Sequence, residues 1–247
     1  MRRQSNEIPA QDSGTFNLSI SDLMAGLLAI FILTLAYCIL SFKDAYTNTN
    51  KHRQEMVRSI GEELNRMEIR VEVDEKRGIL RIPEETLNFH PGSAEVPDRA
   101  TVQRIGAVLL KTLKSSDYRD KVETVFIEGH TDSDPIYGGR YASNWELSTQ
   151  RAINTWHVMR SGYDNKELSE LRNRVTIINS KGQREDIFEL MFSCSGYADT
   201  RPIPNTRNDA AGKKRNRRID IRFTMVPPAP DDSELVKEMS NNLPNNK

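Results

Sequence analysis

The sequence predicts one membrane-spanning helix followed by an α/β domain, a sheet with helices on one face. Three observations support this fold class. Residues 23–42 form a mostly apolar run, which is long enough to cross a hydrocarbon layer of about 30 Å as a helix. Beyond residue 68, strand-like and helix-like patterns alternate, as is typical of α/β folds. The roughly 200 residues after the span suit a linker and one ordinary domain.

Composition excludes several classes of protein. The formal net charge is zero with 28% charged residues, so bulk charge does not indicate a nucleic-acid binder, and we expect no direct nucleic-acid partner. The chain contains no HExxH, CxxC, P-loop or GxSxG motif, and its four histidines show no ligand spacing. We therefore expect no enzyme, no catalytic residue, no metal site and no cofactor.

The apolar run predicts an uncleaved helix. It is longer than a signal-peptide core, and the basic residues Arg2 and Arg3 lie well upstream. The stretch "LAYC", which ends at Cys38, resembles a lipoprotein cleavage site, but Tyr37 precedes the cysteine and the apolar run continues after it. Basic residues are more numerous after the run than before it. By itself this count favours a cytoplasmic C-terminal side.

Asp22 lies at the start of this run and allows two interpretations. It can cap a helix that begins at Leu23, with its carboxylate at the water interface. The preceding "FNLSIS" also carries apolar residues, so the helix can instead begin near Asn17 and take Asp22 into the membrane. A carboxylate there costs at least ~2.5 to 3.5 kcal/mol, which indicates a functional group facing a partner or a water-filled path. Ala25, Gly26 and Ala29 would let another helix approach closely.

The segment 43–67 is polar and compatible with a helix, with an apolar stripe at Met56, Ile60, Leu64 and Met67. This stripe can pack on the chain's own domain, or it can form a self-associating stalk that joins two copies. We expect the second.

The remaining elements follow in order. A hairpin is predicted from 69–73 and 79–82, with "EKRG" in the turn, and then a helix over 98–114. A strand begins at Val122, a helix covers about 145–161, and the strand "RRIDIRFTM" ends the domain. The proline-rich end is expected to be disordered.

Five blocks in this region resemble the OmpA-like peptidoglycan-binding domain in the expected order: "LNFHPGSAEV", "IEGHTDSDP", "NWELSTQRA", "SGYADTRPIPN" and "NRRIDIRF". The resemblance covers roughly residues 70–226. It implies a noncovalent hold on the diaminopimelate residue of the peptidoglycan stem peptide.

The resemblance also implies roles for individual residues. Asp132 would take the ammonium group of the ligand and Arg151 its carboxylate. Asn144 and Arg218 match further residues of the family blocks and are also expected to bind peptidoglycan, with Arg217 next to Arg218. Carboxylate and guanidinium groups suit a zwitterionic ligand. The alternative is that Asp132 pairs with Arg151 or only caps a loop.

The chain departs from the family between the "RA" helix and "GYADTRP". The stretch 164–195 is longer than expected there. We expect an inserted helix or strand near the ligand edge, where it would widen, cover or replace part of the pocket.

The whole layout resembles the MotB-type stator subunit. This implies a cytoplasmic tail (1–16), a transmembrane helix (17–42), a helical stalk (43–67), a periplasmic OmpA-like domain (68–226) and a disordered tail (227–247). It implies an inner-membrane protein with its N-terminus in the cytoplasm, against the count of basic residues. Two copies would stand inside a pentamer of a multi-pass MotA-like subunit, and Asp22 would accept a transported proton or sodium ion.

The short head and stalk look most like the B subunit of the Zorya anti-phage system, which implies an ion-driven motor in defence. The alternatives are a flagellar stator subunit and a passive wall tether in which Asp22 is only a cap. The sequence does not decide between protons and sodium.

Overall fold

The computed structural model describes residues 13–136, 139–206 and 208–228, with side chains from residue 21 onward except at positions 163 and 164. The chain forms two units. The first contains the N-terminal part of the long helix, up to Asn48, and the second is the compact domain Thr49–Pro227. Each is described by itself below.

The helix α1 (Ser13–Arg66) is continuous over 54 residues. It is the one helix in the described part of the chain that is long and apolar enough to cross a membrane. Its large apolar side chains between Leu23 and Phe42 are exposed in the single chain, which a lipid environment or other helices would cover. The predicted N-terminal span is therefore confirmed as a candidate by length and composition.

Asp22 lies inside this helix, nine residues after its first residue Ser13. An N-cap residue stands outside the helical turn that it caps. The interpretation of Asp22 as the N-cap of a helix beginning at Leu23 is therefore wrong, and the helix passes through Asp22, as the upstream apolar residues allowed.

The domain contains a five-stranded sheet in the order β1–β2–β7–β3–β6. The strands are β1 (Glu72–Asp74), β2 (Ile79–Pro83), β3 (Val122–His130), β6 (Phe192–Gly196) and β7 (Arg218–Met225). The strands β3 and β6 are parallel and the other neighbours are antiparallel. The first predicted strand is shorter than expected, because Ile69 and Val71 precede β1, although both are buried.

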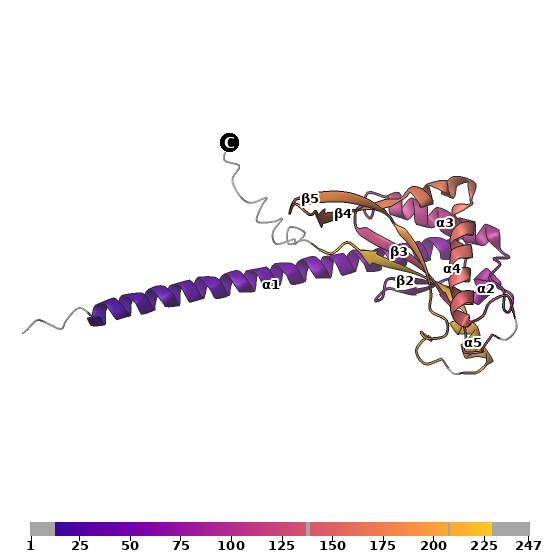
Figure 1. The fold of residues 1–247 in the computed structure, drawn as a ribbon, viewed down its shortest axis with the longest axis horizontal. Helices are drawn as coiled ribbons and strands as arrows, with labels where there is room; N and C mark the ends of the chain where they lie inside the picture. Colours follow the sequence, from indigo (N-terminus) through magenta and orange to yellow (C-terminus); the bar gives the residue numbers. More distant parts are fainter. Residues whose placement is uncertain (1–12, 137–138, 207, 229–247) are drawn as a thin grey trace, which may run out of the picture. The chain divides into compact units, whose positions relative to one another are not determined.

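Helices cover one face of this sheet. They include α3 (Arg99–Lys114) and α4 (Asn144–Arg160), together with the short α2 (Glu84–Leu87), the 3-10 helix η1 (Tyr163–Glu170) and α5 (Ala210–Asn216) around its edges (Figure 1). Alternate residues of β7, such as Ile219 and Ile221, point into the core under the helices. The α/β fold class is confirmed.

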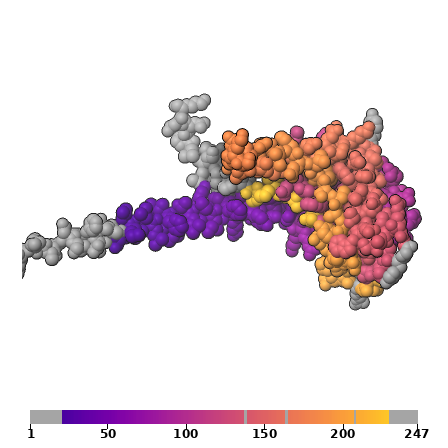
Figure 2. All heavy atoms as spheres, viewed as in Figure 1, coloured from indigo at the N-terminus to yellow at the C-terminus, as the bar shows by residue number. Residues whose placement is uncertain are grey.

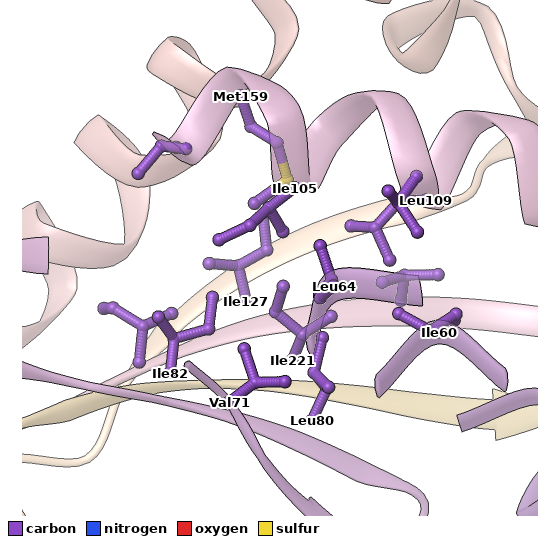
Figure 3. Close-up of a cluster of buried hydrophobic side chains, with 14 of the residues drawn as sticks. Ile60, Leu64, Val71, Leu80, Ile82, Ile105, Leu109, Ile127, Met159 and Ile221 are labelled. Atoms are coloured by element: carbon purple, nitrogen blue, oxygen red, sulfur yellow. The ribbon is translucent and has the colours of Figure 1, made fainter. Parts of the chain in front are cut away.

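The last turns of α1 form part of this core. Met56, Ile60 and Leu64 have no exposed surface, and they pack with residues such as Leu80 and Leu109 (Figure 3). The compact domain thus begins at Thr49 rather than at residue 68. The expectation that this stripe joins two copies is wrong for these three residues, because their own domain buries them completely.

The inserted segment forms a hairpin of its own, with β4 (Arg172–Ile178) and β5 (Arg184–Leu190) in a separate two-stranded sheet. It leads into β6, whose first residue, Phe192, pairs with Val125 near the start of β3. The amide of Asn173 also donates to the carbonyl of Glu123 at 2.5 Å. The hairpin therefore leaves the domain at the start of β3, whereas Asp132 follows its end. The expectation that the insertion lies near the ligand edge is wrong.

Candidate functional site

A cavity of about 910 Å³ lies beyond the carboxyl end of β3. Four segments that are distant in sequence form its wall: the α2 region with the loop after it, the loop after β3, the first turns of α4, and the end of α5. Its charged and polar lining residues include Glu84, Asp132, Asn144, Arg151 and Arg217. The structure thus brings together three of the four residues predicted to bind a ligand.

Asp132 is the acidic centre of the cavity wall. Its Oδ1 accepts a hydrogen bond from the backbone N–H of Asp134 at 3.1 Å, which fixes the carboxylate relative to its own loop. Its Oδ2 accepts from Nη1 of Arg217 at 2.6 Å. The carboxylate pairs with Arg217 rather than with Arg151, so the alternative of an Asp132–Arg151 pair is not what the structure shows.

Arg217 lies between two carboxylates. Its Nε and Nη2 donate to the two oxygens of Glu84 at 2.6 and 2.7 Å, and its Nη1 donates to Asp132. The hydrogen bonds that Arg217 donates to Glu84 and to Asp132 raise its pKa above the ordinary value, against the effect of burial. This group of three carries one more negative than positive charge, so it can still attract a cation.

Arg151 is a buried cation that does not use a carboxylate. Its side chain comes from α4 and is 2% exposed. Its Nε donates to the carbonyl of Ser93 at 2.9 Å and its Nη2 to the carbonyl of His90 at 3.2 Å. The guanidinium also lies over the ring of Phe89, 4.7 Å from its centroid. Within the described part of the chain, no carboxylate forms an ion pair with it.

Burial lowers the pKa of Arg151 to about 10, while Glu84 and Asp132 act in the opposite direction. A group with that pKa remains protonated at neutral pH. Arg151 is therefore a largely desolvated positive charge at the wall of a cavity, and neutral carbonyls balance it only in part. Such a charge can bind an anion strongly.

Asn144 positions the loop that carries Asp132. It is the first residue of α4, and its Nδ2 donates to the carbonyl oxygens of Asp134 at 3.0 Å and of Asp132 at 3.4 Å. The preceding Ser143 caps the helix by accepting from the N–H of Glu146, and the Glu146 carboxylate accepts from the N–H of Ala142, just before the cap. The block "SNWELS" thus sets where the helix begins relative to the cavity.

Two glycines let α4 approach the sheet beside the site. Gly129 of β3 pairs with Gly196 of β6. A Cβ on Gly129 would lie 1.9 Å from the carbonyl oxygen of Ser148, and one on Gly196 would lie 2.3 Å from Oγ1 of Thr149. The glycine in "EGHTD" is therefore a packing requirement that fixes the distance between Arg151, on α4, and Asp132, after β3.

Arg218 lies outside this cavity, which corrects the expectation for it. It is 5% exposed, and its Nε donates to both oxygens of Asp220 at 3.1 Å. Its two Nη groups donate to the carbonyls of Asn216 and Arg201. Arg218 shares the sheet face opposite the helices with Asp220 and Arg222, because alternate residues of a strand share a face. Arg217, which directly precedes β7, lines the cavity instead of Arg218.

Sequence reasoning gave no role to Glu84, to Arg217 or to the carbonyls of His90 and Ser93. The block "LNFHPGSAEV" indicated only the family resemblance, and the structure shows that its loop contributes the carbonyls that bind Arg151. A charged pair such as Glu84 and Arg217, separated by 133 residues, leaves no local sequence signal. Among the described residues, no group of three or more histidine, cysteine, aspartate or glutamate side chains could hold a metal ion.

Asp22, the other predicted site residue, lies in the separate N-terminal unit. Its side chain is exposed in the single chain, next to the exposed apolar residues Leu23 and Met24. A Cβ added to Gly26, one turn further along, would meet no atom within 4 Å. This face of the helix is therefore open to another molecule.

Comparisons with known proteins identify relatives. No family model matches this chain. The chain is 32% identical to the uncharacterized protein YtxE of Bacillus subtilis (strain 168) over 148 residues, which are 60% of this chain and 48% of YtxE. It is 25% identical to Motility protein B of the same organism over 123 residues, which are 50% of this chain and 38% of that protein. The chain therefore spans about half or less of the length of these relatives.

Solved structures also align with the chain. The cell wall anchor of the T6SS from Pseudomonas aeruginosa aligns with 69% of this chain and 97% of its own, at 25% identity and a TM-score of 0.46. A putative MotB like protein from Desulfovibrio vulgaris aligns with 76% of this chain and 99% of its own, at 21% identity and a TM-score of 0.48. In sequence, the chain is similar to Motility protein B over half of its own length.

Proposed function

We propose that the domain binds peptidoglycan in the cavity between Asp132 and Arg151, and that the ligand group is the diaminopimelate residue of the stem peptide. The observation that carries this proposal is Arg151, a buried arginine that lines the cavity and forms no ion pair within the described residues. A buried charge without a counter-ion is costly. A carboxylate from a ligand would provide that counter-ion.

The remaining charges suit the other end of a zwitterion. The free end of diaminopimelate presents one ammonium group and one carboxylate. The carboxylate would bind Arg151 through charge-assisted hydrogen bonds, and the ammonium would bind beside Asp132 and Glu84, which together carry one negative charge more than Arg217 neutralises. Asn144 would hold the loop in position without contacting the ligand.

Sedimentation of the full chain in detergent with purified peptidoglycan tests this function. Asp132→Asn and Arg151→Lys should each weaken binding at least about tenfold, because each removes a charge-assisted or bidentate contact. Asp117→Asn and Arg119→Ala are the matched controls, because both positions are exposed and neither lines the cavity. Free diaminopimelate should compete, and lysine should compete less. Equal binding by all four variants would contradict the proposal.

The same proposal extends to the membrane helix. Two copies of the chain would stand inside a pentamer of a multi-pass MotA-like subunit in the inner membrane, with the N-terminus in the cytoplasm and the domain in the periplasm. Asp22 would bind and release a proton or sodium ion. The support is the helix that continues through Asp22, its open face at Gly26, and the similarity to a protein named for motility.

Energy coupling follows from electrostatics. Ion binding neutralises Asp22, release to the cytoplasm restores its charge, and each cycle changes how partner helices pack against α1. A unit charge that crosses 100 mV supplies about 2.3 kcal/mol. The wall-bound domain would provide the fixed frame for the resulting rotation. Purifying the chain with its partner and counting the copies of each tests the arrangement directly.

The proposed use of this motor is anti-phage defence of the Zorya type. A flagellar stator subunit is the alternative, and it would require a flagellar rotor in the same cell. A defence unit would protect non-motile cells against phage and would be encoded beside nuclease or helicase genes. A passive wall tether is the third possibility, and it differs because its activity would survive the loss of the Asp22 carboxylate.

A further inference from the structure

The inserted hairpin has one face that its own domain does not cover. Asn173 is buried, and Val175 and Ile187 are half-buried, on the face that packs toward the domain. Residues that alternate with them point outward. Among these, Ile178 is 75% exposed, Phe188 61% and Leu190 57%. Figure 2 shows the hairpin, in orange, at the surface of the domain.

This outer face, formed by alternate residues of β4 and β5, combines apolar and basic side chains. Three of its four cross-strand pairs join an arginine to a large apolar residue: Arg172 with Leu190, Arg174 with Phe188, and Arg184 with Ile178. The fourth pair is Thr176 with Asp186, the one acidic residue of the face. Glu185 and Glu189 alternate onto the other face. Asp186 lies 3.8 Å from Arg174, so three arginines against one aspartate leave the face basic and amphipathic.

The hairpin leaves the domain at the end where α1 joins it. Asn173 bonds the carbonyl of Glu123, at the start of β3. Nearby in the chain, Lys121 lies 3.5 Å from the ring of His52, in the first turn of α1 within the domain. In Figure 1, β4 and β5 lie at the opposite end of the domain from α2 and α5, which border the cavity.

Chain length limits how far this end of the domain can lie from the proposed span. Only residues 43–48 separate the predicted span from the domain, which begins at Thr49. These residues cover about 9 Å as a helix and about 20 Å when fully extended. A seven-residue strand such as β4 is itself about 23 Å long. The hairpin is therefore long enough to reach the headgroups of a bilayer that the proposed span would cross.

We propose that the outer face of the hairpin binds the anionic surface of this membrane, with Ile178, Phe188 and Leu190 in the interfacial layer and the arginines on lipid phosphates. The inference rests on the proposed membrane span but not on peptidoglycan binding. Exposed arginines attract anionic headgroups, and aromatic and aliphatic side chains enter the interface. A second copy of the same face is a poorer occupant, because a two-fold interface would bring its arginines together.

Lipid-dependent quenching on the full chain tests the proposal. The chain, with Cys38→Ser and Cys194→Ala, is reconstituted in phosphatidylcholine vesicles containing about one quarter phosphatidylglycerol. A bimane label is placed at Ile178→Cys or, as a control at an exposed position elsewhere in the domain, at Glu95→Cys. Nitroxide-labelled lipid should quench the label at position 178 at least about threefold more than at position 95, and Arg172→Gln with Arg184→Gln should remove most of this difference.

Equal quenching at the two positions would overturn the proposal. So would efficient disulfide formation between two copies carrying Ile178→Cys, which would assign the face to a second chain. Resistance to an alkaline carbonate wash, measured on the same vesicles, reports the span separately, and a chain that washes off would overturn both the span and the docking. Peptidoglycan binding by the variant with Arg172→Gln and Arg184→Gln is measured in parallel, so that loss of wall binding is distinguished from loss of membrane contact.

Discussion

The two acidic side chains at the centre of the proposal, Asp22 and Asp132, have opposite surroundings. Asp132 has partners within its own chain, because Arg217 and the N–H of Asp134 bind its two oxygens. Asp22 lies on an exposed helical face, and among the described side chains none forms a hydrogen bond or ion pair with it. The domain therefore positions its own acidic group, whereas the described side chains of the helix leave Asp22 exposed, as a group that another molecule could bind.

Substitution of Asp22 tests this contrast with the largest expected effect. Asp22→Asn should reduce ion flux through the assembled complex by at least about a hundredfold, since an amide cannot take up and release a proton. Peptidoglycan binding and assembly should be unchanged, because the domain does not use Asp22. Ion flux is measured as the decay of an imposed gradient in vesicles that contain the chain and its partner.

Asp132→Asn is the matched control, and it should give the reverse pattern, with normal flux in vesicles and weak wall binding. A chain that keeps full biological activity with Asp22→Asn would be a tether rather than a motor subunit. Loss of wall binding by Asp22→Asn would contradict the independence of the two regions.

The packing beside the cavity provides a second test. Gly129→Ala would place a methyl group 1.9 Å from the carbonyl of Ser148, so α4 must move away from β3 at a cost of about 3 kcal/mol. Thermal unfolding of the full chain measures this loss. Gly92→Ala is the control, because a Cβ added there would meet no atom within 4 Å. It should cost only the backbone strain that comes from its φ of +68°.

Gly129→Ala should also distinguish an effect on stability from an effect on peptidoglycan binding. Displacement of α4 changes the distance between Arg151 and Asp132, so Gly129→Ala should lose peptidoglycan binding even below its unfolding temperature. A protein that is destabilised but binds normally would show that the cavity tolerates this shift. In contrast, Gly26→Ala, on the open face of α1, should leave the isolated chain as stable as before and should affect only the complex.

Arg151 tests the charge balance of the cavity. Arg151→Lys keeps the charge but loses the planar contacts to the carbonyls of Ser93 and His90, and affinity for peptidoglycan should fall about 10- to 100-fold, which corresponds to about 1.4 to 2.7 kcal/mol. Arg218→Lys is the matched control outside the cavity, and it should change stability more than binding. The measurement is a competition assay with free diaminopimelate. Equal losses of affinity for the two variants would contradict the assignment of the cavity as the site.

The sequence predicted the parts of this molecule that depend on local pattern. The span, the α/β order and the neighbourhood of Asp132, Asn144 and Arg151 follow from apolar periodicity and from ordered motif blocks. The sequence pointed to Arg218, whereas the neighbouring Arg217 lines the cavity. The difference arose because the sequence does not show where β7 begins. That start decides which arginine faces the cavity and which lies against the sheet.

Other features needed the folded chain. A stripe such as Met56, Ile60 and Leu64 has the same spacing whether it packs on its own domain or on a second helix. Only the tertiary structure shows that the core buries it. The position of the insertion likewise depends on the parallel pairing of β6 with β3, a long-range contact that no local pattern records.

A fall in pH should separate the two regions with the smallest effect. Acid should destabilise the domain and leave the N-terminal helix intact. His130 is buried next to Tyr197. Burial, and then the positive charges of Arg218, Arg201 and Arg81, lower its pKa to about 3. Asp220 lies 3.5 Å from Nε2 of the ring but is already bonded to two of these arginines.

The unfolded chain, with a histidine pKa near 6.5, therefore binds more protons than the folded domain between about pH 3 and pH 6.5. Stability then rises with pH across this window and is constant with respect to this group above it. At pH 5 the loss relative to pH 7 should be about 2 kcal/mol from His130. His130→Gln should flatten that part of the profile in urea unfolding followed by Trp145 and Trp156 fluorescence. The helical signal of the first unit in detergent should be the same at both pH values, since no histidine lies in that unit. A parallel loss of helix there would show that the two regions respond to acid together.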